Sequence, residues 1–219
     1  MQLVRWLHPE WHPRRWSNER LRQIGTRLAG DVINVSAWED RDKEGGTYAE
    51  YFPDKTTYAI SNYGGTKGES HRADEIRLDL EKPVPHELRR AFDVVVNHTT
   101  LEHVYDCHAA LDALCELSRD VVVVVVPFMQ IEHWEPTVFG DYWRFTALGL
   151  QRHFEERELT PLYLASNHNP VFPIYYICVA SREPLRWEDA FNFPDNLLSV
   201  PLLEDVAFRP VAPGWELMK

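Results

Sequence analysis

The chain has 219 residues, which is enough for one domain with a substantial core and short for two. Its formal net charge is −11, so most of its surface would repel polyphosphate, and we expect no nucleic-acid partner. The three cysteines form no CxxC pair, the first residues lack the apolar stretch of a signal peptide, and the strongest apolar run is too short to span a bilayer. We therefore expect a cytoplasmic protein without a membrane or disulfide anchor.

Strand and helix patterns alternate along the chain. The opening segment predicts a helix over Glu19–Leu28, with Ser17 or Asn18 as its N-cap. Two more helices are predicted over Tyr105–Ser118 and Phe145–Glu156. Short apolar or β-branched runs predict seven strands, over Asp31–Ser36, Thr56–Ser61, Glu75–Leu80, Phe92–Asn97, Val121–Val126, Thr160–Leu164 and Val171–Ala180.

The order of these elements predicts an α/β fold with a doubly wound, mostly parallel, Rossmann-like sheet of seven strands. The valine run Val121–Val126 is apolar on both faces, as a central parallel strand requires. The last two strands are joined by the turn-rich segment Ser166–Pro170, which predicts an antiparallel terminal strand. We assign residues 1–183 to this domain with its N-terminal helical segment. Residues 184–219 form an apolar but aperiodic extension, packed on the domain or used in a homodimer contact.

Two segments resemble a known family. Phe92–Val104 (FDVVVNHTTLEHV) resembles the strand-four segment of class I S-adenosylmethionine-dependent methyltransferases. Asp141–Thr146 (DYWRFT), followed by Leu148–Leu150, resembles a segment of one branch of that family, whose members often occur among polysaccharide, glycolipid and secondary-metabolite biosynthesis genes. The resemblance implies S-adenosylmethionine as cofactor and a small-molecule or glycan intermediate as methyl acceptor.

The resemblance also implies where the cofactor binds, at loops beyond the carboxyl ends of the strands. After the first strand, Ser36 and Trp38 stand where the family usually has glycines. After the second, the neutral Asn62 stands where a carboxylate usually binds the ribose, so we expect weaker cofactor affinity. The residues expected to frame the cofactor are Ser36, Ala37, Trp38, Asp40, Asn62, Asp79, Leu80 and Asn97.

The substituted glycine turn leaves three hypotheses open. The first is a divergent but working S-adenosylmethionine site. In the second, cofactor binding is lost or remodelled, and Trp38 fills part of the old site of an enzyme that catalyses a different reaction. In the third, the chain is a non-catalytic partner subunit of another protein.

Histidines are the best candidates for catalysis, because methylation of a hydroxyl needs a base near neutral pH. His133, after the fifth strand, is the first choice and His98, after the fourth, the second, whereas His103 is interpreted as structural. The spacing of the histidines and cysteines predicts no metal site.

The acceptor pocket is predicted at Asp141, Tyr142, Trp143 and Arg144. Arg144 would grip a phosphate or carboxylate with two parallel hydrogen bonds, and Trp143 would stack on a sugar or base. The alternative interpretation makes Asp141 the cap of a helix, with the aromatic side chains packed on the sheet.

Overall fold

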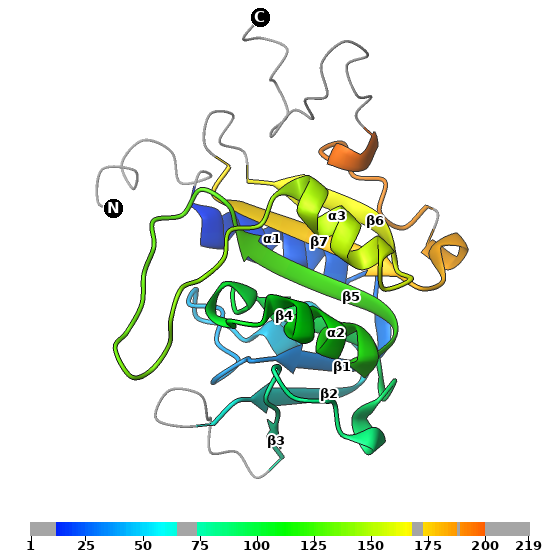
Figure 1. Cartoon of the computed structure of the whole chain (residues 1–219). Coiled ribbons are helices and arrows are strands. Elements are labelled where there is room, and N and C mark those ends of the chain that lie inside the picture. The colour runs from blue at the N-terminus through cyan, green and yellow to red at the C-terminus, as the bar shows by residue number, and fades with distance from the viewer. Residues whose placement is uncertain (1–11, 65–73, 168–172, 188, 200–219) are drawn as a thin grey trace, which may run out of the picture.

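A computed structural model describes residues 12–64, 74–167, 173–187 and 189–199. Its centre is a seven-stranded sheet with the strand order β3-β2-β1-β4-β5-β7-β6 (Figure 1). The strands are β1 (Ala29–Val35), β2 (Asp54–Asn62), β3 (Ile76–Arg77), β4 (Phe92–His98), β5 (Ser118–Pro127), β6 (Thr160–Ser166) and β7 (Tyr175–Ser181).

The predicted sheet is confirmed. The pairs β1–β2, β1–β4, β2–β3 and β4–β5 are parallel, and β7 runs antiparallel to both β5 and β6. All six valines of Val121–Val126 are fully buried, because β5 lies between β4 and β7 with both of its faces covered. The predicted strand start at Val171 lies outside the described residues.

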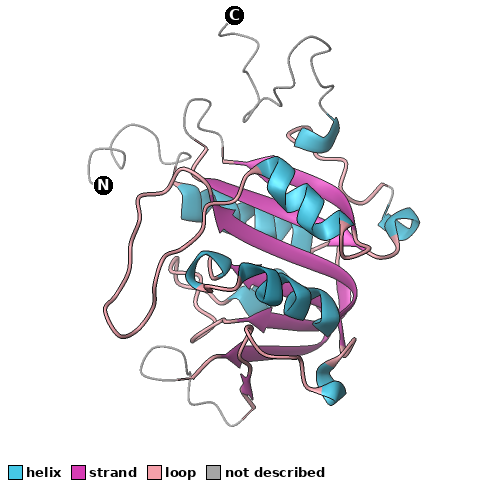
Figure 2. Ribbon diagram, viewed as in Figure 1, coloured by secondary structure: helices cyan, strands magenta, loops and turns pink. Residues whose placement is uncertain are grey.

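Helices cover both faces of the sheet (Figure 2). On one face, α1 (Pro13–Gly25) packs Leu21 and Ile24 into the core that contains the odd-numbered valines of β5. On the other, α2 (Cys107–Leu117) and α3 (Ala147–Glu155) pack against the even-numbered valines. Within the described residues, no helix is long and apolar enough to span a membrane.

The predicted start of the first helix was wrong. The helix begins at Pro13, whose fixed φ suits a first helical position, and the His12 side chain caps it by accepting a hydrogen bond from the Arg15 N–H. The proposed caps Ser17 and Asn18 are instead buried inside the helix. The helix therefore begins more than one helical turn earlier in the sequence than predicted, and it includes Arg14.

The third strand is shorter than predicted, because the chain turns after Arg77. Asp79 Oδ1 accepts a hydrogen bond of 2.9 Å from the Glu81 N–H, and the Asp79 carbonyl accepts one of 3.1 Å from Lys82. Within the described part of the C-terminal extension, Phe191 and Leu197 are buried against the two faces of the domain.

Candidate functional site

The first loop, Ser36–Asp40, follows β1 at the carboxyl edge of the sheet. Ser36, Trp38 and Asp40 adopt φ angles of 60°, 50° and 60°, in the left-handed region that favours glycine. Ser36 and Trp38 are the positions where the resemblance places glycines. The loop therefore follows a glycine-type backbone path without any glycine.

Asp40 holds the end of the first loop. Its side chain is buried, and Oδ1 accepts hydrogen bonds from Asn34 Nδ2 at 2.8 Å and from the Tyr58 hydroxyl at 2.6 Å. Oδ2 accepts from the Ala49 N–H at 3.0 Å. Three donors therefore converge on this carboxylate, which makes Asp40 a structural anchor of the loop.

Asn62, at the end of β2, clamps the backbone of Trp38. Its Oδ1 accepts from the Trp38 N–H at 2.6 Å, and its Nδ2 donates to the Trp38 carbonyl at 3.1 Å and to Glu75 Oε1 at 2.6 Å. These contacts use both amide hydrogens, and the Oδ1 that would accept from a ribose hydroxyl already accepts from the Trp38 N–H. They also bring the half-buried Glu75 carboxylate to the end of β2, a placement that the sequence interpretation missed.

Asn97, at the end of β4, offers a buried acceptor beside the first loop. Its Nδ2 donates to the Val35 carbonyl at 3.1 Å, whereas its Oδ1 has no hydrogen-bond partner among the described residues. The Ser61 hydroxyl, at the end of β2, is also buried without a partner in that part of the chain. A buried polar atom without a partner costs about 1–3 kcal/mol, and a bound ligand is one explanation for it.

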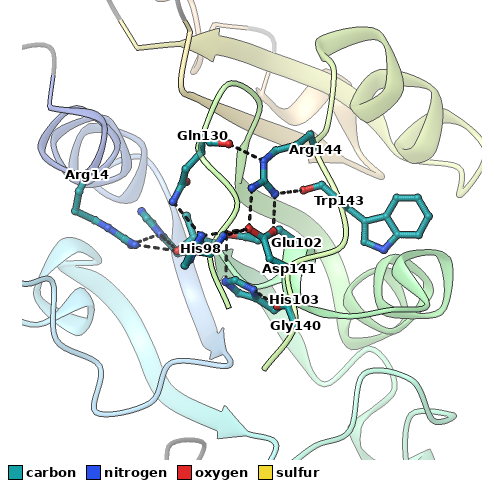
Figure 3. Close-up of polar contacts among 11 residues, drawn as sticks. Arg14, His98, Glu102, His103, Gln130, Gly140, Asp141, Trp143 and Arg144 are labelled. Atoms are coloured by element: carbon teal, nitrogen blue, oxygen red, sulfur yellow. Dashed lines mark hydrogen bonds and ion pairs between the residues drawn. The ribbon is translucent and has the colours of Figure 1, made fainter. Parts of the chain in front are cut away.

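Arg14 reaches from α1 to the end of β4 (Figure 3). Its guanidinium lies 2.6 Å from His98 Nδ1 and donates to Thr99 Oγ1 at 3.0 Å and to the Tyr48 hydroxyl at 3.4 Å. Sequence reasoning missed this residue, because only the true start of α1 aims it at the sheet.

His98 helps to position Arg14 in this arrangement. Nδ1 must accept from the guanidinium, and Nε2 donates to Ser17 Oγ at 3.0 Å, since that hydroxyl itself donates to the Arg14 carbonyl. Burial, and then the charge of Arg14, hold the pKa of His98 well below its ordinary value. With both nitrogens engaged, His98 is not placed to accept a proton from a substrate in this conformation.

Glu102 is a buried carboxyl group on the turn after β4. It is only 1% exposed, Oε1 lies 3.7 Å from His103 Nε2, and Oε2 has no hydrogen-bond partner among the described residues. His103 is oriented by its Nδ1, which donates to the Gly140 carbonyl at 2.6 Å. Burial raises the pKa of Glu102 to about 8, so the group is mostly protonated at neutral pH.

His133 lies on segment 128–146, which loops out beyond the carboxyl end of β5 (Figure 1). Its side chain is 44% exposed, and its Nδ1 lies 3.2 Å from Asp141 Oδ2. Burial raises the pKa of Asp141, but hydrogen bonds from Arg144 and from the His133 N–H outweigh it and lower the value overall. An ionised carboxylate therefore orients an accessible imidazole, an arrangement suited to a general base.

The remaining predicted pocket residues have protein partners. Arg144 already makes its bidentate pair with Asp141, at 2.5 and 2.7 Å, and its Nε donates to the Gln130 carbonyl. Trp143 donates from its indole N–H to two backbone carbonyls, and its ring points away from Arg14 (Figure 3), while Tyr142 is half exposed. The alternative that made Asp141 a helix cap is wrong, because the side chain of Thr146 caps α3.

Comparisons with known proteins give a fold. No known protein family and no curated protein matches the sequence. Among solved structures, a methyltransferase from Mesorhizobium loti described as S-adenosylmethionine-dependent aligns with a TM-score of 0.56 and 11% identity, over 78% of this chain and 99% of its own. The 1,6-didemethyltoxoflavin-N1-methyltransferase of Burkholderia thailandensis, solved with 1,6-didemethyltoxoflavin and S-adenosylhomocysteine, aligns with a TM-score of 0.51 and 16% identity, over 81% and 80%.

A third similar structure is a putative methyltransferase from Haloferax volcanii, in complex with the Trm112 methyltransferase activator, with a TM-score of 0.56 and 11% identity over 77% of this chain and 90% of its own. This chain has the class I methyltransferase fold. In a methyltransferase fold, as in other open α/β sheets, the carboxyl edge is where ligands bind. The first loop, Asn97, Arg14 and His133 all lie at this edge.

Proposed function

We propose that the protein transfers a methyl group from S-adenosylmethionine to a small-molecule or glycan biosynthetic intermediate. The observation that carries the proposal is the first loop of this methyltransferase fold. Ser36 and Trp38 both keep the left-handed backbone that glycines would give, so the loop retains the shape on which such a cofactor rests.

The residues around this loop fit the proposed cofactor. Asn97 Oδ1 is a buried acceptor that an ammonium group would satisfy, and the Glu75 carboxylate lies at the strand end where a ribose hydroxyl donates. The adenine would lie toward Asp79 and Leu80. When bound, the cofactor supplies an electrophilic methyl group on a sulfonium.

His133 is the proposed base. In the tautomer whose Nδ1 proton faces Asp141 Oδ2, 3.2 Å away, Nε2 is the nitrogen that would take a proton from an acceptor hydroxyl as the new bond forms. Arg144 keeps Asp141 ionised and in place. The proposed work of this pair is orientation and proton transfer, and the methyl group itself moves without acid catalysis.

Loss of cofactor binding is the weaker alternative. Trp38 is 45% exposed, so its ring is not packed into the domain as a permanent plug. The buried acceptor on Asn97 also argues for a ligand at this edge. A non-catalytic partner subunit would not need an exposed histidine beside an ionised carboxylate at this edge.

Calorimetric titration with S-adenosylhomocysteine tests the proposal. Saturable binding at one site is expected for the wild type. Asn97→Leu removes the buried acceptor and should weaken binding by about tenfold, whereas the exposed Asn192→Leu should leave it unchanged. Melting temperatures of both variants separate loss of binding from loss of folding. No binding by the wild type at millimolar ligand would contradict the proposal.

A further inference from the structure

Arg14 carries a half-buried positive charge that no carboxylate of the described residues neutralises by direct contact. Its hydrogen-bond partners Tyr48, His98 and Thr99 are all uncharged, and among the described residues no carboxylate lies within ion-pair distance of it. Glu102, whose charge would act on Arg14, is mostly protonated at neutral pH. Burial opposes the charge of Arg14, but Tyr175 and Tyr48 outweigh it and raise the pKa overall, so the guanidinium stays charged and can receive an anion.

The backbone at this place is strained. Thr99 adopts a φ of 51°, which is rare for a β-branched residue, and its N–H donates to the Val125 carbonyl at 2.8 Å. Strain of this kind concentrates at ligand-binding sites. Here it holds the Thr99 hydroxyl against the Arg14 guanidinium, beside His98, and so fixes the direction in which Arg14 points.

We propose that Arg14 binds a carboxylate or phosphate group on the methyl acceptor. The acceptor is then an acidic small molecule. This inference rests on the proposed function, because it assumes that an acceptor enters at the carboxyl edge of the sheet.

The position of Arg14 assigns the anion to the acceptor and not to the cofactor. The proposed cofactor contacts lie over β1 and β2, with Asn97 of β4 at their border. Arg14 binds Thr99 beyond that border, and its guanidinium lies 5.9 Å from the centre of the Tyr175 ring, on β7 at the other side of β5. Two of the groups that Arg14 approaches, Thr99 and Tyr175, therefore lie in the half of the edge that the nucleoside is not proposed to cover.

The test is a titration of the full chain with inorganic phosphate, monitored by NMR chemical shifts. The titration is done at low ionic strength and in the presence of saturating S-adenosylhomocysteine. The variants are Arg14→Gln, Arg14→Lys and the matched control Arg15→Gln, an exposed neighbour that pairs with Glu44. We expect saturable shifts in the wild type and the control. Arg14→Gln should weaken phosphate binding by about tenfold or more, and Arg14→Lys by less. The spectra themselves report whether each variant is folded.

Three results overturn the inference. The first is no saturable phosphate binding by the wild type, and the second is an equal loss of phosphate affinity in Arg14→Gln and Arg15→Gln. The third is a pattern in which Arg14 affects cofactor binding. In that third pattern, Arg14→Gln weakens binding of S-adenosylhomocysteine but not of 5′-methylthioadenosine, which lacks the carboxylate, so the anion belongs to the cofactor. If S-adenosylhomocysteine does not bind at all but phosphate still binds in an Arg14-dependent manner, the proposed function fails and the anion site stands.

Discussion

The two halves of the carboxyl edge treat their polar groups differently. In the half formed by β1 and β2, Asp40 and Asn62 form hydrogen bonds with the protein's own backbone and neighbouring side chains. In the half formed by β4 and β5, Asn97 Oδ1, Glu102 Oε2 and Gln130 Oε1 are buried without partners among the described residues. In the first half only Ser61 Oγ is buried without a described partner, so the second half leaves more polar groups available to a ligand.

This difference explains how the first loop can dispense with glycine. A left-handed residue other than glycine costs about 1–2 kcal/mol, and the loop contains three. The amide of Asn62 offsets part of that cost by binding the N–H and the carbonyl of Trp38. The buried carboxylate of Asp40 offsets more of it by fixing the end of the loop. Glycine makes such a path intrinsically available, whereas here tertiary hydrogen bonds enforce it.

The largest expected effect comes from the β4–β5 half. His133→Ala removes the proposed base, so turnover with a matched acceptor should fall by about a hundred- to ten-thousand-fold. Affinity for S-adenosylmethionine should hardly change, because the proposed cofactor contacts lie on other loops. Kinetics and calorimetry on the same preparation check both statements, and near-normal turnover would remove His133 from the mechanism.

The next effect concerns the stability of the first loop. Asp40→Ala leaves the Asn34, Tyr58 and Ala49 donors unpaired in a buried place, so the free energy of unfolding should drop by about 3 kcal/mol or more. Asp40→Asn keeps an acceptor oxygen and should lose less. Urea denaturation measures both. A loss below about 1 kcal/mol for Asp40→Ala would show that the loop does not depend on this anchor.

Trp38→Gly tests the strain of the first loop, in the β1–β2 half. Glycine relieves the left-handed strain at this position, which outweighs its entropic cost, so stability should rise by about 0.5–1 kcal/mol. Removing the indole should also tighten binding of S-adenosylhomocysteine by up to about tenfold, equivalent to ~1.4 kcal/mol. Weaker binding in the variant would mean that the Trp38 ring is a ligand contact and not an obstacle.

The smallest effect tests the protonated state of Glu102. Burial raises its pKa to about 8 from an ordinary value of 4.5, so the folded chain holds a proton that the unfolded chain has released. Folded stability therefore falls as pH rises toward 8. Relative to wild type, Glu102→Gln should gain about 1 kcal/mol in unfolding free energy between pH 7 and 8.

The choice of pH window isolates Glu102. Burial lowers the pKa of His98 and His103 from 6.5, so both rings stay mostly neutral above that pH in the folded and the unfolded chain. Urea denaturation at several pH values measures the difference between variant and wild type. If that difference is constant across the window, Glu102 is ionised in the folded protein, and its assignment as a protonated group is wrong.

The sheet was predictable, because strand identity depends on local patterns such as the valine run of β5 and the turn-rich end before β7. The pairing of His133 with Asp141 had a local signal too, since the two residues lie close in sequence. Arg14 had none. Its role depends on where α1 begins. The helix begins at Pro13, although Ser17 and Asn18 are residue types with a stronger N-cap preference.

Roles that depend on partners far apart in the chain were out of reach. Asn62 was assigned to a ribose by its position after a strand, yet its amide is taken up by the backbone of Trp38. In the sequence, Glu102 is one residue of a family segment, and only the folded structure shows that its carboxyl group is buried. A strand end is visible in a sequence, but which groups are left unpaired there is decided by tertiary contacts.

A crystal structure of the chain grown with S-adenosylhomocysteine tests the central claim most directly. The account predicts the ligand's thioether over Ser36–Trp38, its ammonium within hydrogen-bond distance of Asn97 Oδ1, and its adenine near Asp79 and Leu80. The left-handed backbone of the first loop should be unchanged. Ligand density elsewhere on the chain, or none at saturating concentration, would contradict it.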